Sequence, residues 1–150
     1  MIMDESLNVF DDPLVPCGAD PVTGFFRDGC CNTNDDDVGS HTVCVEMTRE
    51  FLEYSRFRGN DLTTPAPDFG FPGLKPGDTW CLCAARWLEA YENNMAPRVY
   101  LMRTHKKALQ IVALDKLKEF AADLNWQIIT GCQKLAGRIT IESGKVLLCN

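Results

Sequence analysis

The sequence predicts a single α+β domain with a small, mainly antiparallel sheet, about three helices and two long, structured loops rich in Gly and Pro. Three observations support this fold class. The chain has 150 residues, a length typical of one domain. Its contents of 45% apolar and 24% charged residues are those of an ordinary globular protein. Short β-rich runs and helical patterns alternate with segments in which Gly and Pro interrupt every regular period.

The two predicted loops span residues 11–40 and 60–78, and each contains seven Gly and Pro residues. Both also carry a pair of phenylalanines, Phe25 and Phe26 in the first and Phe69 and Phe71 in the second. Since apolar rings are unfavourable in water, we expect the first loop to pack onto the domain. A nineteen-residue loop is uncommon inside a compact domain and is frequently functional, so the second loop is expected to cover the sheet or a site.

Between the loops, residues 42–47 form a short, β-branched, alternating run that predicts a strand. A helix follows over residues 48–58, since Thr48 is a favourable N-cap and Gly59 suits the left-handed conformation that ends a helix. Residues 78–93 fit either one continuous helix or a strand to Cys83 followed by a helix over 84–93. The Pro-Gly turn that precedes them favours the strand and helix.

The rest of the chain predicts a β-hairpin with strands in 97–103 and 108–112, then an amphipathic helix over 114–121. We expect the globular domain to span residues 1–122 and residues 123–150 to form a C-terminal extension. Two β-rich runs flank Ser143-Gly144 in that extension and predict a second hairpin. Because a lone hairpin is marginal in water, it should dock on the domain's own sheet or on a second copy, forming a homodimer.

The formal net charge is -6. Binding to nucleic acid or to an anionic membrane depends on clustered Lys and Arg, so neither is an expected partner. No run reaches the roughly 18 apolar residues of a membrane span, and the N-terminus is acidic where a signal peptide would be basic. We therefore expect a cytoplasmic protein. Residues 1–46 hold ten acidic residues and one basic residue, Arg27, and the run at 35–37 predicts an exposed acidic turn.

Eight cysteines are present. In a reducing cytoplasm, they are expected to remain free thiols that serve as buried apolar residues, metal ligands or nucleophiles, rather than to form disulfides.

Four stretches resemble the signature of a family of small, mostly bacterial proteins known as a conserved domain of unknown function. They are PCGADPVTGFFRDGCCN at 16–32, DVGSHTVC at 37–44, RGNDL at 58–62 with FGFPGLKPGD at 69–78, and WCLCAARW at 80–87. The resemblance covers about residues 8–122, and residues 123–150 depart from it. It implies no activity, cofactor or catalytic residue.

The working hypothesis is a Cys/His-rich site that binds a metal or a small ligand. Zinc prefers four soft ligands, commonly delivered in Cys-x2-Cys spacing, and that spacing does not occur here. A zinc site would therefore assemble through space, and its candidate ligands are Cys17, Cys30, His41, Cys81 and Cys83.

A thiol-dependent enzyme is the second hypothesis. Cys30 or Cys31 would act as nucleophile and His41 as base, with Asp20 or Asp28 orienting the imidazole. Arg27 and nearby backbone N–H groups would lower the thiol pKa.

The third hypothesis is a non-catalytic interaction module, in which the two loops form a concave surface for a small ligand or a protein. The candidate ligand-binding residues are Cys17, Asp20, Arg27, Phe69, Phe71 and Trp80. If the family motifs build one site, a cysteine among Cys17, Cys30 and Cys31 should lie within about 10 Å of Cys81 or Cys83, a contact-scale separation.

Overall fold

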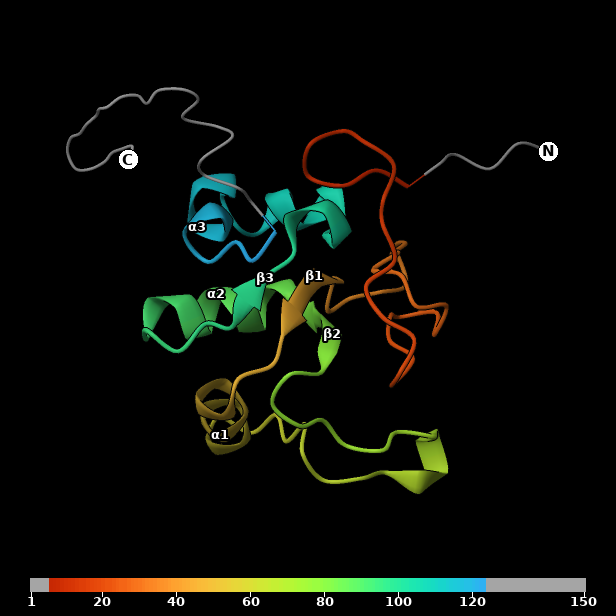
Figure 1. Ribbon diagram of the computed structural model, residues 1–150, viewed down its shortest axis with the longest axis vertical. Coiled ribbons are helices and arrows are strands. Elements are labelled where there is room, and N and C mark those ends of the chain that lie inside the picture. The colour runs from red at the N-terminus through yellow and green to blue at the C-terminus, as the bar shows by residue number, and fades with distance from the viewer. Residues whose placement is uncertain (1–5, 124–150) are drawn as a thin grey trace.

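The computed structural model describes residues 6–123. Within them, a three-stranded antiparallel sheet has the order β2-β1-β3 (Figure 1). The strands are β1 (His41–Glu46), β2 (Thr79–Cys83) and β3 (Arg98–Val99), and the α-helices are α1 (Arg49–Phe57), α2 (Ala84–Glu92) and α3 (Leu114–Glu119). The predicted α+β class is confirmed. Residues 78–93 form a strand followed by a helix, which is the favoured one of the two predicted alternatives.

The sheet lies between α2 and the loop that precedes β1 (Figure 1). Side chains alternate across a strand, and the two faces of the sheet differ in chemistry. Val43 and Leu82 are opposed in register on one face and belong to the main apolar core with Trp87 of α2. Cys44 and Cys81 are opposed on the other face and form a separate buried cluster beneath the loop.

Helix α1 begins and ends as its sequence predicts. The Thr48 hydroxyl accepts a hydrogen bond from the Phe51 N–H at 3.1 Å. This N-cap gives a partner to a backbone N–H in the first turn, where no helix carbonyl is available. Gly59 follows the helix with φ of 95°, a conformation that favours glycine. Phe51 and Leu52 are buried, so the helix packs its apolar face on the core.

Trp87 organises the contact between α2 and α3. Its side chain is fully buried, and its indole N–H donates to the Pro97 carbonyl at 3.1 Å. The Tyr91 and Phe120 rings lie 5.5 and 5.8 Å from the indole, measured between ring centroids. Helices α2 and α3 therefore share one aromatic cluster.

The predicted hairpin over residues 97–112 is wrong. Only β3 pairs with the sheet there, and 3-10 helices at Leu101–Arg103 and Lys106–Gln110 replace the two predicted strands over most of the remaining length. The backbone donors find partners other than a second strand: the Asp123 carboxylate accepts from the Leu101 N–H, and the Thr42 carbonyl accepts from the His105 N–H. Tertiary contacts of this kind override β-propensity, which depends strongly on context.

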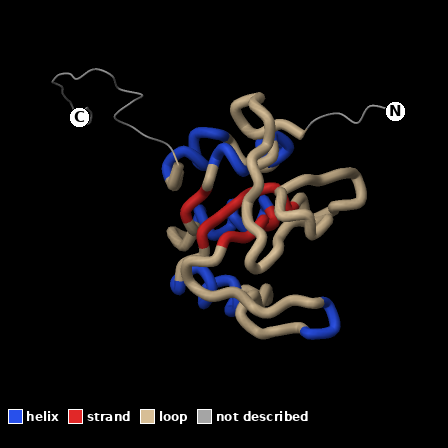
Figure 2. The backbone as a smooth tube through the Cα atoms, turned by 45° about the vertical axis from the view of Figure 1, so that its right-hand side comes forward, coloured by secondary structure: helices blue, strands red, loops and turns tan. Residues whose placement is uncertain are grey.

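Figure 2 shows the two predicted loops as long, mainly irregular segments. Hydrogen bonds order both of them. In the first loop, the Val15 N–H donates to the Met102 carbonyl of the 3-10 region. In the second loop, the Leu74 N–H donates to the Leu62 carbonyl. Among residues 6–123, the longest helices have nine residues, and none could reach across a bilayer. The predicted C-terminal hairpin lies outside the described residues.

Candidate functional site

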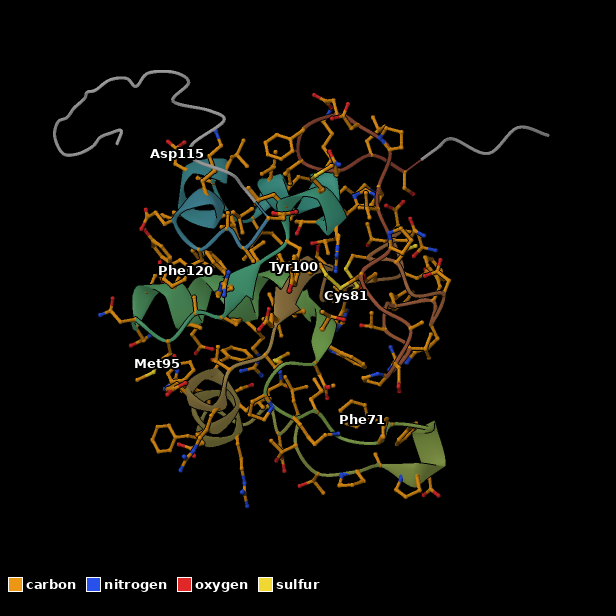
Figure 3. The ribbon with its side chains drawn as sticks, in the orientation of Figure 1. Phe71, Cys81, Met95, Tyr100, Asp115 and Phe120 are labelled. Carbon is orange, nitrogen blue, oxygen red and sulfur yellow. A yellow bond between two sulfur atoms is a disulfide. The ribbon has the colours of Figure 1, made fainter. Side chains whose placement is uncertain are left out.

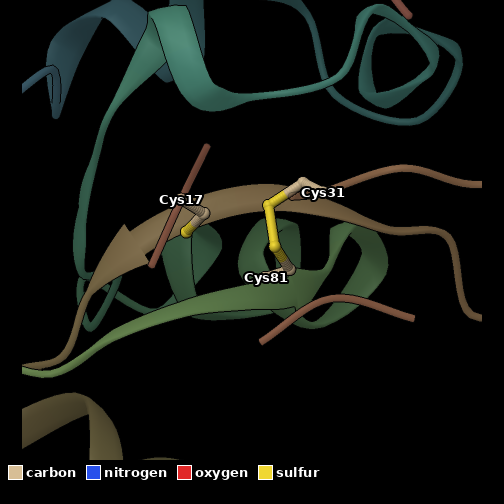
Figure 4. A group of neighbouring side chains, drawn as sticks. All are labelled: Cys17, Cys31 and Cys81. Atoms are coloured by element: carbon tan, nitrogen blue, oxygen red, sulfur yellow. A yellow bond between two sulfur atoms is a disulfide. The ribbon is translucent and has the colours of Figure 1, made fainter. Parts of the chain in front are cut away.

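Two disulfides join the first loop to the sheet, Cys17–Cys44 and Cys31–Cys81, with Cα–Cα separations of 5.8 and 5.3 Å. The prediction that these thiols are free is therefore wrong. The loop brings Cys17 and Cys31 onto the face of the sheet that carries the other two residues, and both separations suit a disulfide. The predicted proximity of the loop cysteines to Cys81 is confirmed (Figure 4).

The structure only partly assembles the predicted metal ligands. The Sγ atoms of Cys17, Cys31 and Cys81 lie within 4.8 Å of one another, although Cys31 is a predicted nucleophile rather than a predicted ligand. Cys30 and Cys83 keep free, half-buried thiols outside that cluster. Cys44, bonded to Cys17, belongs to the cluster and was missed.

A cavity of about 380 Å³ opens beside the Cys31–Cys81 disulfide, where the two long loops approach each other. Figure 3 labels Phe71 and Cys81, two of its lining residues. Five of the sequence-predicted site residues share this lining with Cys81: Arg27, His41, Phe69, Phe71 and Trp80. The two family motifs that carry Arg27 and Trp80 therefore meet at one cavity.

Arg27 supplies the cavity's positive charge. Its guanidinium lies 5.1 Å from the centroid of the Trp80 ring, and its Nη1 donates to the Gly24 carbonyl at 2.6 Å. The Phe71 ring packs edge-on against Trp80 with 5.3 Å between centroids. These contacts hold a cation beside an aromatic wall.

His41 is oriented by Asp37, rather than by Asp20 or Asp28. The imidazole Nδ1 lies 2.7 Å from the Asp37 carboxylate, which also accepts from the His41 backbone N–H and from the Thr33 hydroxyl. Burial opposes ionisation of Asp37, but these hydrogen bonds outweigh it and lower the pKa of the carboxyl. Asp37 is buried, so the exposed acidic turn predicted at 35–37 is wrong at its last residue.

Neither of the two aspartates that were predicted to orient His41 forms a hydrogen bond with it. Asp28 accepts hydrogen bonds from the Cys30 backbone N–H at 3.0 Å and from the Asn32 amide at 2.9 Å, and so orders the turn around the adjacent cysteines. Asp20 is exposed and does not line this cavity.

The thiol chemistry expected at the adjacent cysteines does not match their environment. Cys31 is bonded to Cys81 and has no thiol in this structure. Burial and the Asp28 charge raise the pKa of the Cys30 thiol, which opposes formation of the nucleophilic thiolate. The prediction that Arg27 lowers the pKa of the Cys30 thiol is therefore wrong in direction.

Two residues of the candidate sites were missed by the sequence analysis, Asp37 beside His41 and Cys44 in the cysteine cluster. Both lie in the DVGSHTVC stretch, and Asp37 precedes His41 by four residues. In a loop, however, that spacing does not place two side chains together as it does in a helix, so the motif was the available signal.

Comparisons with known proteins agree with the motifs. No curated protein matches the chain. The sequence profile of DUF2237, described as uncharacterised proteins conserved in bacteria, matches residues 7–121, which include the cavity and all four bonded cysteines. The chain belongs to this family.

Proposed function

We propose that this domain binds a small planar organic anion, such as an aromatic carboxylate, in the cavity between its two long loops. One observation carries the proposal: the cavity joins aromatic walls to a single guanidinium, that of Arg27. Small-molecule sites are typically apolar and aromatic cavities of about 300–1,000 Å³ with a few placed polar groups. The cavity's volume of about 380 Å³ suits a ligand of one or two rings.

The charge distribution supports an anion at this position. The chain is acidic overall, and Arg27 is the one basic residue among residues 1–46. A guanidinium presents planar N–H groups that match a carboxylate in a bidentate pair. Because the Gly24 carbonyl and the Trp80 ring already restrict the Arg27 side chain, binding an anion there loses little further rotamer entropy.

The aromatic lining supports a planar ligand. Phe71 and Trp80 form one wall, and Phe25 lies against the His41 ring with 6.3 Å between centroids. His41 Nδ1 is engaged by Asp37, so the remaining ring nitrogen, Nε2, is the group that a ligand hydroxyl would meet. In the neutral imidazole with a proton on Nδ1, Nε2 accepts a hydrogen bond.

Isothermal titration with matched ligands tests this proposal. Benzoate and 2-naphthoate should bind, whereas benzamide and 2-naphthamide should bind at least tenfold more weakly. Arg27→Gln should weaken carboxylate binding about 10- to 100-fold, the range that corresponds to a hydrogen bond with a charged group. Arg49→Gln, on an exposed arginine of α1, is the matched control and should leave Kd unchanged.

Equal affinity for the acids and their amides would contradict the proposal, and so would carboxylate binding that is insensitive to Arg27→Gln. A Phe71→Leu variant provides an independent measurement, since it removes a ring from the wall and keeps the charge. It should weaken naphthoate binding more than benzoate binding.

We also propose the cytoplasm as the working compartment. Disulfides are uncommon there and are usually transient or redox-sensing when they occur, so the four bonded cysteines would spend time reduced. Alkylation of thiols in rapidly quenched cells tests this point. Permanently unmodified Cys17 and Cys81 would contradict it.

A further inference from the structure

We infer that Cys17, Cys31, Cys44 and Cys81, once reduced, form a tetrathiolate site for Zn²⁺ beneath the ligand cavity. The two disulfides are then the oxidised form of the same four residues. This ligand set is distinct from the one predicted from sequence, which lacks Cys31 and Cys44, and the inference does not depend on the proposed anion binding.

The sulfur positions support a four-ligand site. In tetrahedral zinc, Zn–S distances of about 2.3 Å place neighbouring sulfurs about 3.8 Å apart. The Sγ atoms of Cys17, Cys31 and Cys81 already lie within 4.8 Å of one another, although two different disulfides contain them. The Cys44 sulfur, bonded to Cys17, is outside this group of three, so reduction has to open both disulfides and χ1 rotation has to bring the fourth sulfur to the others.

Hydrogen bonds as well as the disulfides hold the backbone at three of the four cysteines. Cys44 and Cys81 are opposed on β1 and β2. Their N–H groups donate to the buried hydroxyls of Thr104 at 3.1 Å and Thr23 at 2.8 Å. The Cys17 N–H donates to the Gly29 carbonyl at 2.7 Å. This hydrogen bond holds the start of the loop close to the segment that carries Cys31. These hydrogen bonds fix the backbone positions from which the sulfurs project.

The burial and charge of the surroundings suit a metal centre. All four cysteines have 2% or less of their surface exposed. Zinc with four thiolates carries a net charge of -2, and two arginines lie near the cluster. Arg103 donates to the Cys17 carbonyl at 3.5 Å and lies over the Tyr100 ring, which packs on the cluster. Arg27 lines the cavity together with Cys81.

The interconversion balances with a dithiol as reductant. Each disulfide accepts two electrons and two protons from one dithiol, which becomes a disulfide, so two dithiols yield the four thiols. Zn²⁺ then binds the four thiolates and displaces four protons to solvent. In the opposite direction, two equivalents of a small-molecule disulfide oxidise the cysteines and release the metal.

Metal titration of the full chain tests the inference. Protein reduced with a phosphine should take up one equivalent of Zn²⁺ from zinc chloride, measured by atomic emission after gel filtration, while oxidised protein should take up none at this cluster. Co²⁺ in place of Zn²⁺ should show the intense thiolate-to-metal charge transfer and visible bands of a tetrahedral sulfur site.

Alkylation with iodoacetamide and peptide mapping identifies the ligands without any substitution. Zn²⁺ should protect Cys17, Cys31, Cys44 and Cys81 and leave Cys30 and Cys83 reactive. Cys44→Ser should lower Zn²⁺ affinity by at least about tenfold, because the loss of a residue that only supports a metal ligand already costs about that much. Cys83→Ser, on the same strand as Cys81, is the matched control and should bind normally.

The inference is overturned if folded, reduced protein takes up no metal. Protection of Cys30 or Cys83 in place of the four cysteines would overturn it as well. Should Cys44→Ser fail to fold, the mapping on the unsubstituted chain still decides the outcome. Loss of benzoate binding leaves this result untouched, since metal uptake and anion binding are measured separately.

Discussion

The two faces of the sheet are stabilised by different means. On the α2 side, the core consists of large apolar residues such as Trp87, Phe51 and Leu82, each with 2% or less of its surface exposed. On the loop side, two disulfides and the buried polar residues Thr23 and Thr104 hold the chain to the strands. The cysteine cluster lies on the loop side, whereas the cavity is lined both by Cys81 of that cluster and by Trp80 of the main core.

This difference follows from the local sequence. Helices α1, α2 and α3 present periodic apolar faces, which bury enough area to be stable through the hydrophobic effect. The first loop has no such period, so covalent and polar links hold it instead. Stability on the helical side should therefore be insensitive to redox state, whereas the shape of the ligand cavity should depend on it.

The largest effect is expected for Trp87→Ala on the helical side. Replacing a fully buried tryptophan by alanine should lower the free energy of unfolding by about 3–5 kcal/mol, measured by urea denaturation. The loss should be the same in oxidised and in reduced protein. Phe57→Ala on α1 is the control: its ring is 84% exposed, and the change should be within about 0.5 kcal/mol.

Removal of one disulfide by Cys31→Ala with Cys81→Ala should lower the free energy of unfolding by about 2–4 kcal/mol in metal-free protein. Amide hydrogen exchange should quicken in the first loop while α2 stays protected. Cys30→Ala, at the adjacent free thiol, is the control for lost side-chain packing. Equal exchange in both regions would show that the two faces unfold together.

Asp37→Asn should lower the free energy of unfolding by about 1–3 kcal/mol at neutral pH, because a buried carboxylate acceptor is lost. The folded state lowers the pKa of Asp37 below its ordinary value of 3.8. Its contribution is therefore complete above that pH and disappears as the pH falls through the folded-state pKa. Asp36→Asn, at the exposed neighbour, should have little effect at any pH.

The smallest effect is expected at His105, which lies half-buried at the edge of the loop side. Burial, and then the Lys107 charge, lower its pKa below 6.5. The unfolded chain therefore binds the proton more readily, and stability should decrease as the pH falls below about 6.5. His105→Asn keeps an acceptor for the Lys107 N–H and should flatten this dependence. Parallel pH curves for the two proteins would contradict the assignment.

Local signals in the sequence predicted the regular elements well. Thr48 and Gly59 bound α1 because capping depends on residues adjacent to the helix ends. The hairpin at 97–112 failed because the same β-rich run meets Asp123 and Thr42 in the folded chain. Propensity does not include such partners.

The candidate site was predicted in part. Arg27, His41 and Trp80 were identified from motif chemistry, and all three line the cavity. Asp37 was missed, because whether a loop carboxylate is buried depends on what packs over it.

The sequence by itself determined the strand and the helix at β1 and α1, the acidic balance and the family, and it favoured the strand and the helix at β2 and α2. Those properties depend on residue type and on neighbours within a few positions. Only the tertiary structure decided that Cys17 meets Cys44, that Cys31 meets Cys81, and that Arg27 lies over Trp80. Each of these contacts joins residues 27 to 53 positions apart, and it forms because the first loop folds back against the strands of the sheet.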